Sequence, residues 1–380
     1  MSEERSVHQA ALPQKMSAAL ATVVILTLGM LSAFTTREAP LLVAKALWIC
    51  AIGFMAYRVF LTGIIGRWRS VFFIILAWSF VVHFKAQLIG LTGSAFITPE
   101  IQEVPYCHIA MSSSFLNYLY QQYLALMSGS WLKWSPLTWG ALWLLVTLAL
   151  GQAWCSWACM YGGLDSGFSK ILRKPLVKWR GLPKGLRDLP AGILVAALLI
   201  SLVTLKPVFC LWMCPLKLGT GFLEPDTLKN MLQFLSFFFI GLFFLVLLPL
   251  LTKKRAFCGL ICPFGAWQSF FGRINPYRVK IDPDKCTLCE KCVSACPTFA
   301  IDKDRPIEER VLPYCNRCGE CMDVCPALAI DYHLVGEKKL GIPNTWPRRL
   351  FLLSSWMVAG AVSLLFVPEA LLRLWRCLPL

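Results

Sequence analysis

The chain contains two cysteine runs of identical spacing, CTLCEKCVSACP at residues 286–297 and CNRCGECMDVCP at residues 315–326. Each run places three cysteines at every third position, a fourth cysteine four positions later, and a proline directly after it. This is the spacing of bacterial two-cluster iron–sulfur proteins, in which the fourth cysteine of each run ligates the other cluster. A pair of zinc ribbons is the alternative, but zinc sites usually separate two C-x2-C pairs by a longer loop.

The two runs predict two [4Fe–4S] clusters in one small module. Three thiolates on a tight loop take three corners of a cube, and a distant thiolate closes the fourth corner. The crossed fourth ligands then lock both halves of the module together. The expected ligands are Cys286, Cys289, Cys292 and Cys325 for cluster 1, and Cys315, Cys318, Cys321 and Cys296 for cluster 2.

The rest of the 380-residue chain is strongly apolar. Hydrophobic residues make up 57 % and charged residues 15 %, against roughly 45–50 % and 25 % in soluble proteins. A helix needs about 20 apolar residues to cross a membrane. We therefore expect an all-α polytopic membrane protein of about seven transmembrane helices, with a small α+β ferredoxin insert. The expected spans are 16–35, 41–63, 71–92, 136–154, 190–208, 231–251 and 350–369.

The formal charge of +16 predicts an orientation in the membrane. Basic residues gather in the short loops after the second, fourth and sixth spans and before the seventh, whereas 93–134 holds only Lys133. Because Lys and Arg favour the cytoplasmic side, we expect the N-terminus and the ferredoxin insert inside and the C-terminus outside the inner membrane. The basic residues form no single patch, which excludes nucleic-acid binding. The short, regular spacings of the 17 cysteines also argue against a disulfide-rich secreted protein.

Four regions follow from these spans. The first three spans are expected in 1–134, together with an outer loop and an interfacial helix near 113–127, which is too short and polar to span. The membrane core is expected in 135–272 and the cytoplasmic dicluster ferredoxin domain in 273–345. A last transmembrane helix and a short outer tail are expected in 346–380.

Three C-x3-C pairs lie at the ends of apolar spans, in WCSWAC at 154–159, FCLWMCP at 209–215 and FCGLICP at 257–263. If each span continues as a helix, positions i and i+4 share one face, with Cβ atoms about 5–6 Å apart. The Cys155/Cys159 and Cys258/Cys262 pairs lie at the predicted inner edge. Together they offer one complete ligand set, Cys155, Cys159, Cys258 and Cys262.

The remaining pair, Cys210 and Cys214, is called the third pair below and lies at the predicted outer edge. Cys107 is the other loop cysteine expected near it, so an outer-edge cluster is expected on these three, with His108, another protein group or an exogenous ligand as the fourth. If the fifth span is re-entrant, all three pairs lie inside and the outer cluster disappears. Redox-active dithiols, a copper or zinc site, or simple packing are the alternatives for all three pairs.

His83 and Lys85 lie within the third span. Ionisable residues at membrane depth favour a functional site, and these two could flank the headgroup of a quinone. A hydrogen-bonded His83 and a Lys85 that extends to the outer interface are the alternative. A b-type haem is disfavoured, because it would normally need a second axial histidine inside the bilayer.

The stretch FCGLICPFGA at 257–266, the earlier C-x3-C-P at 210–215 and the double ferredoxin run resemble the membrane polyferredoxin family. That family includes NapH, the membrane half of NosR and the CcoG-type proteins, and the layout is closest to the NapH type. The resemblance covers roughly 135–335. It implies electron transfer between the quinone pool, or a cytoplasmic donor, and a redox partner. The chain departs from the family pattern at Met160, which follows the Cys155/Cys159 pair where a proline is expected. It also has three C-x3-C pairs instead of two, and a seventh span.

The predicted function is therefore single-electron transfer, as a subunit of a larger respiratory or redox complex. The expected route runs from the ferredoxin clusters to the inner-edge cluster and then to the outer-edge site. No catalytic triad, P-loop or dinucleotide motif is found, so a partner is expected to supply the catalysis. Two alternatives stay open: a metal (copper) reductase or cofactor-assembly factor for a respiratory enzyme, and a structural or anchoring iron–sulfur subunit.

Overall fold

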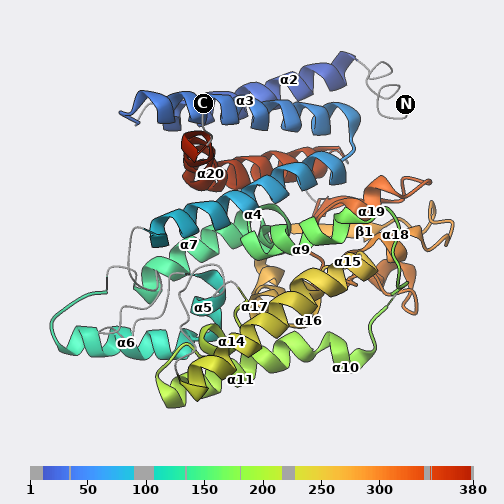
Figure 1. Ribbon diagram of the computed structural model, residues 1–380. Coiled ribbons are helices and arrows are strands. Elements are labelled where there is room, and N and C mark those ends of the chain that lie inside the picture. Colours follow the sequence, from blue (N-terminus) through green and yellow to red (C-terminus); the bar gives the residue numbers. More distant parts are fainter. Residues whose placement is uncertain are drawn as a thin grey trace.

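The computed structural model describes residues 12–33, 36–89, 107–132, 135–179, 181–215, 227–337, 343 and 345–377. In this part of the chain the fold is mainly helical, with one two-stranded sheet. The helices run alongside one another across Figure 1, with the ferredoxin elements β1, α18 and α19 at one end and α6 at the other. The chain therefore joins a bundle of apolar helices to a small module at one end of that bundle.

The larger helices pack in layers. Helix α2 lies on α3, α20 lies against both α3 and α4, and α9 lies against the other side of α4 (Figure 1). Their bounds are α2 (Leu12–Ala33), α3 (Ala39–Thr62), α4 (Gly66–Ile89), α6 (Phe115–Met127), α7 (Pro136–Ala149), α9 (Met160–Ile171), α11 (Leu189–Thr204), α14 (Leu228–Ile240) and α20 (Trp346–Cys377). The shorter segments are α5 (His108–Ser113), η1 (Gly151–Ala153), α8 (Trp154–Trp157), α10 (Lys184–Arg187), α12 (Val208–Trp212), η2 (Gly241–Leu247), α15 (Leu248–Thr252), α16 (Ala256–Leu260), α17 (Pro263–Phe271) and η3 (Gly272–Ile274).

Each of the seven predicted spans overlaps a helix in the described residues. Among the described residues, three helices are long and apolar enough to cross a membrane: Ala39–Thr62, Leu228–Thr252 and Trp346–Arg376. Two others, Lys15–Leu31 and Leu189–Thr204, are apolar but shorter. The 16 residues of α11 rise about 24 Å at 1.5 Å per residue, less than the hydrocarbon core of about 30 Å. The protein thus has several candidate spans, and the total of about seven stays a prediction.

The fourth predicted span, 136–154, is not a straight helix. The chain bends by 98° between Pro136–Ala149 and Gly151–Trp157. Asn275 donates from Nδ2 to the carbonyls of Thr147 and Leu148, both at 2.8 Å. These bonds satisfy the carbonyl groups that a helix leaves free at its C-terminus. The helix ends there because distant side chains cap it, which the local sequence does not indicate.

The ferredoxin module is a small α+β unit, as predicted. Strand β1 (Tyr277–Ile281) pairs antiparallel with β2 (Ile330–Leu334), in a register from Tyr277 opposite Leu334 to Ile281 opposite Ile330. The short helices α18 (Lys291–Ala295) and α19 (Glu320–Asp323), with a turn of 3-10 helix η4 (Ile307–Glu309), lie between the strands in sequence. Tyr332 stacks on Phe351 of α20, with ring centroids 4.2 Å apart. One hydrophobic core therefore continues from the module into the apolar helices.

Helices α4 and α9 approach closely at Gly163. A Cβ atom there would lie 2.6 Å from the carbonyl oxygen of Phe73 and would also meet the side chain of Ala77. We expect Gly163→Ala to lower the free energy of unfolding by about 1–3 kcal/mol, because neither helix can yield without repacking. Gly167→Ala on the same helix is the control, since its nearest neighbour in Ile74 would lie at an ordinary 3.7 Å. Thermal unfolding in detergent measures both, and equal effects would contradict the prediction.

Candidate iron–sulfur sites

The Cys155/Cys159 and Cys258/Cys262 pairs share one local conformation, which differs from the continuous helix assumed from the spacing. The first cysteine of each C-x3-C pair lies in a short helical turn, within α8, α12 or α16. Cys159 and Cys262 then adopt extended backbone (φ −74, ψ 122 and φ −67, ψ 112) and start α9 and α17. Pro263 explains this for Cys262, because a residue before proline avoids the helical region. Cys159 adopts the same conformation without a following proline.

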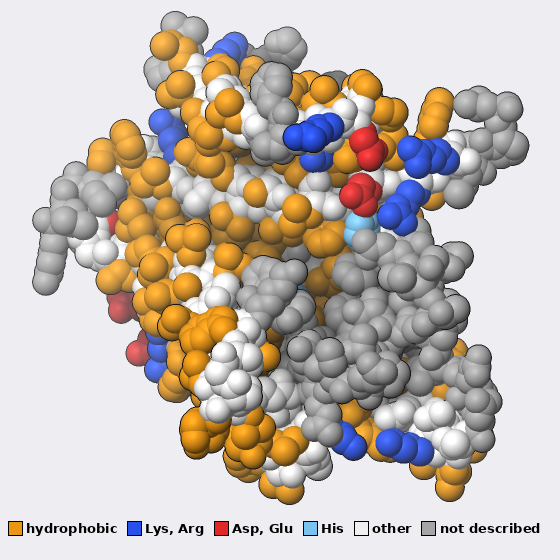
Figure 2. Space-filling model, turned by 90° about the vertical axis from the view of Figure 1, so that its left-hand side faces the viewer, with side chains coloured by type: hydrophobic (Ala, Val, Ile, Leu, Met, Phe, Trp, Pro, Cys, Tyr) orange, Lys and Arg blue, Asp and Glu red, His pale blue; other side chains and the backbone are white. Residues whose placement is uncertain are grey.

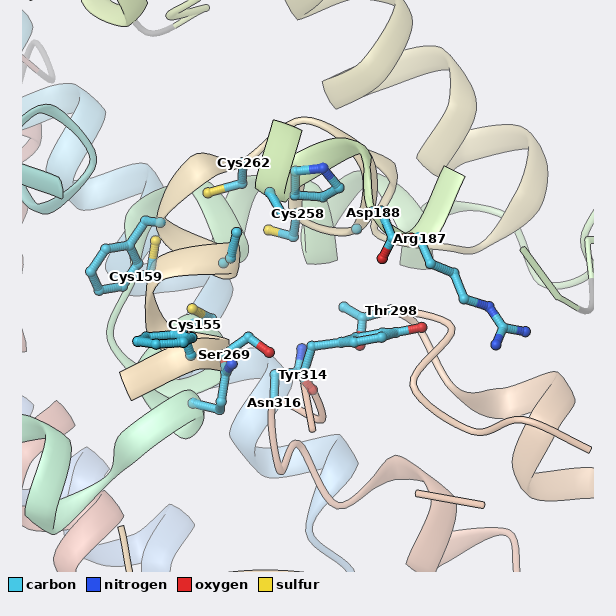
Figure 3. A pocket seen from close by; sticks show the side chains of 18 of the residues that line it. Cys155, Cys159, Arg187, Asp188, Cys258, Cys262, Ser269, Thr298, Tyr314 and Asn316 are labelled. Atoms are coloured by element: carbon cyan, nitrogen blue, oxygen red, sulfur yellow. The ribbon is translucent and has the colours of Figure 1, made fainter. Parts of the chain in front are cut away.

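The four cysteines predicted at the inner edge come together. Cys155, Cys159, Cys258 and Cys262 line one cavity of about 270 Å³. Figure 3 shows them grouped on one side of this cavity, from two separate segments of the chain. Thr298, Tyr314 and Asn316 of the ferredoxin module line it as well. The four-thiol cavity thus lies where the apolar helices meet the module.

The residues of this cavity fit a [4Fe–4S] cluster. All four cysteines are free thiols, and such a cluster takes four thiolates, one at each corner. Three buried polar atoms of the lining, Gln152 Nε2, Thr298 Oγ1 and Asn316 Nδ2, have no hydrogen-bond partner among the residues that the structure describes. Across the described ranges, no three His, Cys, Asp or Glu side chains converge closely enough to hold a single metal ion.

Arg255 joins the two cysteine pairs of this cavity to the ferredoxin module. Its side chain is 1 % exposed. The guanidinium donates to the carbonyl of Cys155, to Ser156 Oγ at 3.2 Å and to Cys258 Sγ at 3.5 Å. Its backbone N–H donates to the carbonyl of Pro297 at 2.7 Å. One buried cation therefore holds the four-thiol cavity against the turn that follows Cys296.

Asp165 holds the third cysteine of the set in place. Its Oδ2 accepts a hydrogen bond from the backbone N–H of Cys258 at 2.9 Å. Burial raises the pKa of Asp165 to about 7, while the nearby Arg255 acts in the opposite direction. Asp165 is fully buried on α9, so α9 and α16 are tied together directly at the site.

The ligand set predicted for cluster 2 also comes together. Cys296, Cys315, Cys318 and Cys321 line a second, smaller cavity inside the ferredoxin module. Asn316 lines this cavity and the four-thiol cavity as well. The two cavities therefore share Asn316 in their walls.

The cluster 1 cysteines lie in the equivalent part of the module. Burial raises the pKa of the Cys292 thiol, and the neighbouring Cys286 and Cys289 raise it further. Cys325 Sγ accepts from the N–H of Ala329 at 3.4 Å, as Cys296 Sγ accepts from Ala300 at 3.2 Å. The fourth cysteines of the two runs therefore occupy equivalent turns, and the exact ligand sets stay predictions.

The third pair lies beside the four-thiol cavity and not across a membrane from it. Tyr161, two residues after Cys159, makes a hydrogen bond from its hydroxyl to Cys214 Sγ at 2.9 Å and stacks on Phe257 at 5.4 Å. Cys107 packs against the cores that contain Cys210 and Cys214. The predicted separation by one membrane thickness is corrected here. The reason is that α12 follows α11 after a sharp turn at Leu205 (φ 52) and packs back against it.

His108 is in contact with the four-thiol set. Its Nε2 is 3.2 Å from Cys159 Sγ, and burial lowers its pKa to about 4. The imidazole is therefore neutral at physiological pH. The structure places His108 against Cys159, so its predicted role as fourth ligand beside Cys210 and Cys214 stays a prediction.

His83 is paired in the structure. Its Nδ1 lies 2.9 Å from Glu369 Oε2 of α20, and Glu369 in turn lies 3.7 Å from Arg373. On the end of the molecule that Figure 2 shows, opposite the ferredoxin module, a few charged side chains gather beside a histidine, and the other described side chains around them are mainly hydrophobic. The side chain of Lys85 is outside the described part of the structure. Quinone contact by these two residues stays a prediction.

The sequence did not identify the cations that hold the module in place. Arg69 donates to Glu320 at 2.7 Å and to the carbonyl of Ser156 at 2.7 Å, and Lys170 lies 2.9 Å from Glu320. Burial acts to raise the pKa of Glu320, but Lys170 and Arg69 outweigh it and the pKa is lowered. Lys254 donates to the carbonyl of Cys296 at 2.7 Å. In the sequence these residues indicated only the orientation in the membrane, although Lys254 and Arg255 lie four and three positions before Cys258.

Two family models match the chain. A 4Fe–4S dicluster domain matches 278–326, which contains both cysteine runs. A 4Fe–4S binding domain matches three segments, 132–179, 189–221 and 235–281, and each of them contains one C-x3-C pair. All three pairs therefore lie within sequence typical of iron–sulfur binding.

Several curated relatives are named as putative electron-transport or ferredoxin-type proteins. The putative electron transport protein YccM of Escherichia coli is 26 % identical over 44 % of this chain and 47 % of its own length. The ferredoxin-type protein NapH of Haemophilus influenzae is 30 % identical over 38 % of this chain and 47 % of its own. A methylamine utilization ferredoxin-type protein, MauN of Paracoccus denitrificans, is 40 % identical over 13 % of this chain and 18 % of its own.

The matches extend over about half the length of YccM and NapH. No solved structure matches the chain. The cysteine geometry, the domain matches and the relatives agree with the resemblance found in the sequence. The chain carries the [4Fe–4S] binding domains of ferredoxin-type proteins and resembles the NapH-like membrane polyferredoxin family.

Proposed function

We propose that this protein passes single electrons through three adjacent cysteine sites, from the ferredoxin module into the apolar helices. The observation that carries the proposal is the shared wall at Asn316, which lines both the four-thiol cavity and the cluster 2 cavity. Bound [4Fe–4S] clusters would supply one-electron chemistry, with potentials set by hydrogen bonds, charge and exposure. Direct passage between neighbouring sites needs no diffusing carrier.

We propose the following ligand sets. Cys286, Cys289, Cys292 and Cys325 hold cluster 1; Cys315, Cys318, Cys321 and Cys296 hold cluster 2; Cys155, Cys159, Cys258 and Cys262 hold the next one. Cys107, Cys210 and Cys214 form a third-pair site next to it. For that site, the hydrogen bond between the Tyr161 hydroxyl and Cys214 Sγ supports a thiolate whose negative charge is stabilised.

The protein's own residues exclude water from the route and offset its negative charge. Arg255, Arg69 and Lys254 are each at most 3 % exposed and lie between the helices and the module. Buried cations of this kind stabilise the negative charge that thiolate-ligated iron carries. Their placement supports a role in electron transfer across this interface.

The cellular setting is also proposed. The candidate spans support a membrane protein, and the charge distribution favours a cytoplasmic ferredoxin module in the inner membrane. NapH and MauN are named as ferredoxin-type proteins, the latter of methylamine utilization. By analogy we propose that this chain works with other subunits of a redox complex, with the quinone pool or a cytoplasmic donor at one end.

Iron and acid-labile sulfide per purified chain, with low-temperature EPR of the dithionite-reduced protein, test this function. About eight irons would account for the ferredoxin module alone, about twelve would add the four-thiol site, and about sixteen would add the third-pair site. We expect at least twelve, with every cluster reducible. Eight irons would refute the route into the helices, and redox-silent clusters would favour a structural or anchoring role.

Removal of one hydroxyl tests the third-pair site. Tyr161→Phe removes the hydrogen bond to Cys214 Sγ but keeps the stacking on Phe257. A hydrogen bond to a charged group contributes about 1.5–3 kcal/mol, so we expect the potential of one cluster to fall by about 60 mV or more. An EPR-monitored redox titration measures this. The exposed Tyr123→Phe on α6 is the control, and a set of unchanged potentials in Tyr161→Phe would contradict a cluster at Cys214.

A further inference from the structure

The two halves of the ferredoxin module are an internal repeat. Every cysteine of the second run lies 29 positions after its counterpart in the first. The backbone repeats too, with left-handed residues at equivalent positions: Leu288 and Arg317, Glu290 and Gly319, Phe299 and Leu328. Because the fourth ligands cross over, Arg317, Gly319 and Phe299 surround cluster 2, whereas Leu288, Glu290 and Leu328 surround cluster 1.

Around cluster 2 these positions form the contact with the rest of the chain. Arg317 is 5 % exposed and donates to the carbonyl of Leu150 at 2.8 Å. Gly319 lies against Ile65. Phe299 is 3 % exposed and packs against Trp179 at 5.0 Å. This set of positions therefore buries cluster 2 beneath the helices and places it next to the four-thiol cavity.

Around cluster 1 the same positions are open. Leu288 is 55 % exposed and Leu328 is 78 % exposed. Cys289, which directly follows Leu288 in the chain, is exposed as well. The neighbouring charges nearly balance, with Lys285 and Lys291 against Asp282, Asp284 and Glu290. Two large apolar side chains thus stand in solvent around a ligand cysteine, where their counterparts in the other half are buried.

We propose that Leu288, Cys289, Glu290 and Leu328, here called the cluster 1 rim, are the docking surface for a separate one-electron iron–sulfur protein. The inference rests on the proposed function and adds the entry point for its partner. The internal repeat supports this proposal. The equivalent surface around cluster 2 contacts the helices, and the next cysteine site lies on the other side of that contact. Because the charges next to the rim nearly balance, we expect a partner whose own cluster is surrounded by apolar side chains. One electron leaves the reduced partner and enters the module, and no atom is transferred.

The test uses the full chain in nanodiscs with its clusters intact, and a reduced soluble two-cluster ferredoxin as the probe. Leu288→Glu and Leu328→Glu are expected to slow its reduction of the chain about tenfold in anaerobic stopped flow, because a carboxylate would be buried at an apolar contact. Val335→Glu is the matched control, since Val335 is 59 % exposed just beyond the far end of β2. The oxidised probe is also expected to protect the amides of 284–291 from hydrogen exchange in the unsubstituted chain.

Reduced methyl viologen separates docking from electron transfer itself. Equal ferredoxin rates in all variants, with normal viologen rates, would overturn the docking surface and leave the proposed function standing. Failure of viologen to reduce the clusters in the unsubstituted chain would refute the proposed function instead. If a glutamate variant loses iron, Leu288→Gln and Leu328→Gln carry the same comparison. A dimer in sedimentation that Leu328→Glu dissociates would overturn the proposal by assigning the rim to a second copy.

Discussion

Serine in place of Cys258 is expected to remove about four irons from each chain and to leave the two ferredoxin clusters in place. Cys258 lines the four-thiol cavity and is held by three groups: Asp165 at its backbone N–H, Arg255 at its sulfur, and the helical turn α16. A serine hydroxyl is a poor ligand for iron in place of a thiolate. Because this site lies between the module and the third pair, its loss should stop electron passage into the helices.

Iron analysis and EPR measure this outcome directly. The variant should retain the EPR signals of the two ferredoxin clusters while one further signal disappears. Cys50→Ser is the control, because Cys50 is an exposed free cysteine on α3, away from every predicted site. An iron content that does not change in Cys258→Ser would show that the four thiols serve another purpose, such as redox-active dithiols.

The features set by short-range spacing were predictable from the sequence. The ferredoxin module and its strands follow from cysteines three and four residues apart, where backbone geometry leaves few arrangements. One further step was needed to predict a single ligand set from two distant cysteine pairs. Both pairs, Cys155/Cys159 and Cys258/Cys262, had to be assigned to the same membrane edge. The four-thiol cavity agrees with that assignment.

The features set by distant contacts were not predictable. The helix after Pro136 ends at Ala149 because Asn275 and Arg317 cap its last carbonyls and Gly151 turns the chain at a positive φ of 56°. Hydropathy cannot register such a cap, so the sequence suggested a straight span. The same limit applies to the third pair, whose position beside Tyr161 depends on the fold-back after α11.

Charge was the most ambiguous signal in the sequence. A lysine or arginine at the end of a span favours the cytoplasmic side whether it faces water or protein. The sequence therefore could not distinguish a basic residue in solvent from Arg255 or Lys254, which are buried against the turn that holds Cys296. Only the folded arrangement shows that these cations belong to the sites.

Arg255→Gln is expected to lower the potentials of two clusters and leave the third unchanged. Burial alone would lower the pKa of Arg255, but the charges of Cys258, Asp165 and Cys318 raise it above its usual value. The guanidinium thus interacts with the four-thiol site and with cluster 2. Removing one buried positive charge from both should lower each potential by about 60 mV or more. Cluster 1, with its exposed Cys289 on the far side of the module, should not change.

The same substitution is expected to destabilise the contact between the module and the helices. Loss of one partner from a buried charge network lowers the free energy of unfolding by about 3–5 kcal/mol, because Asp165 then stays buried without its cation. Arg255→Lys separates the two effects. It keeps the charge but cannot reach Ser156, Cys155 and Cys258 with one planar group, so the potentials should be largely restored and the stability should not. The exposed Arg349→Gln is the control. Equal shifts in all three cluster potentials would refute local action by Arg255, since only a global change in the fold would reach cluster 1.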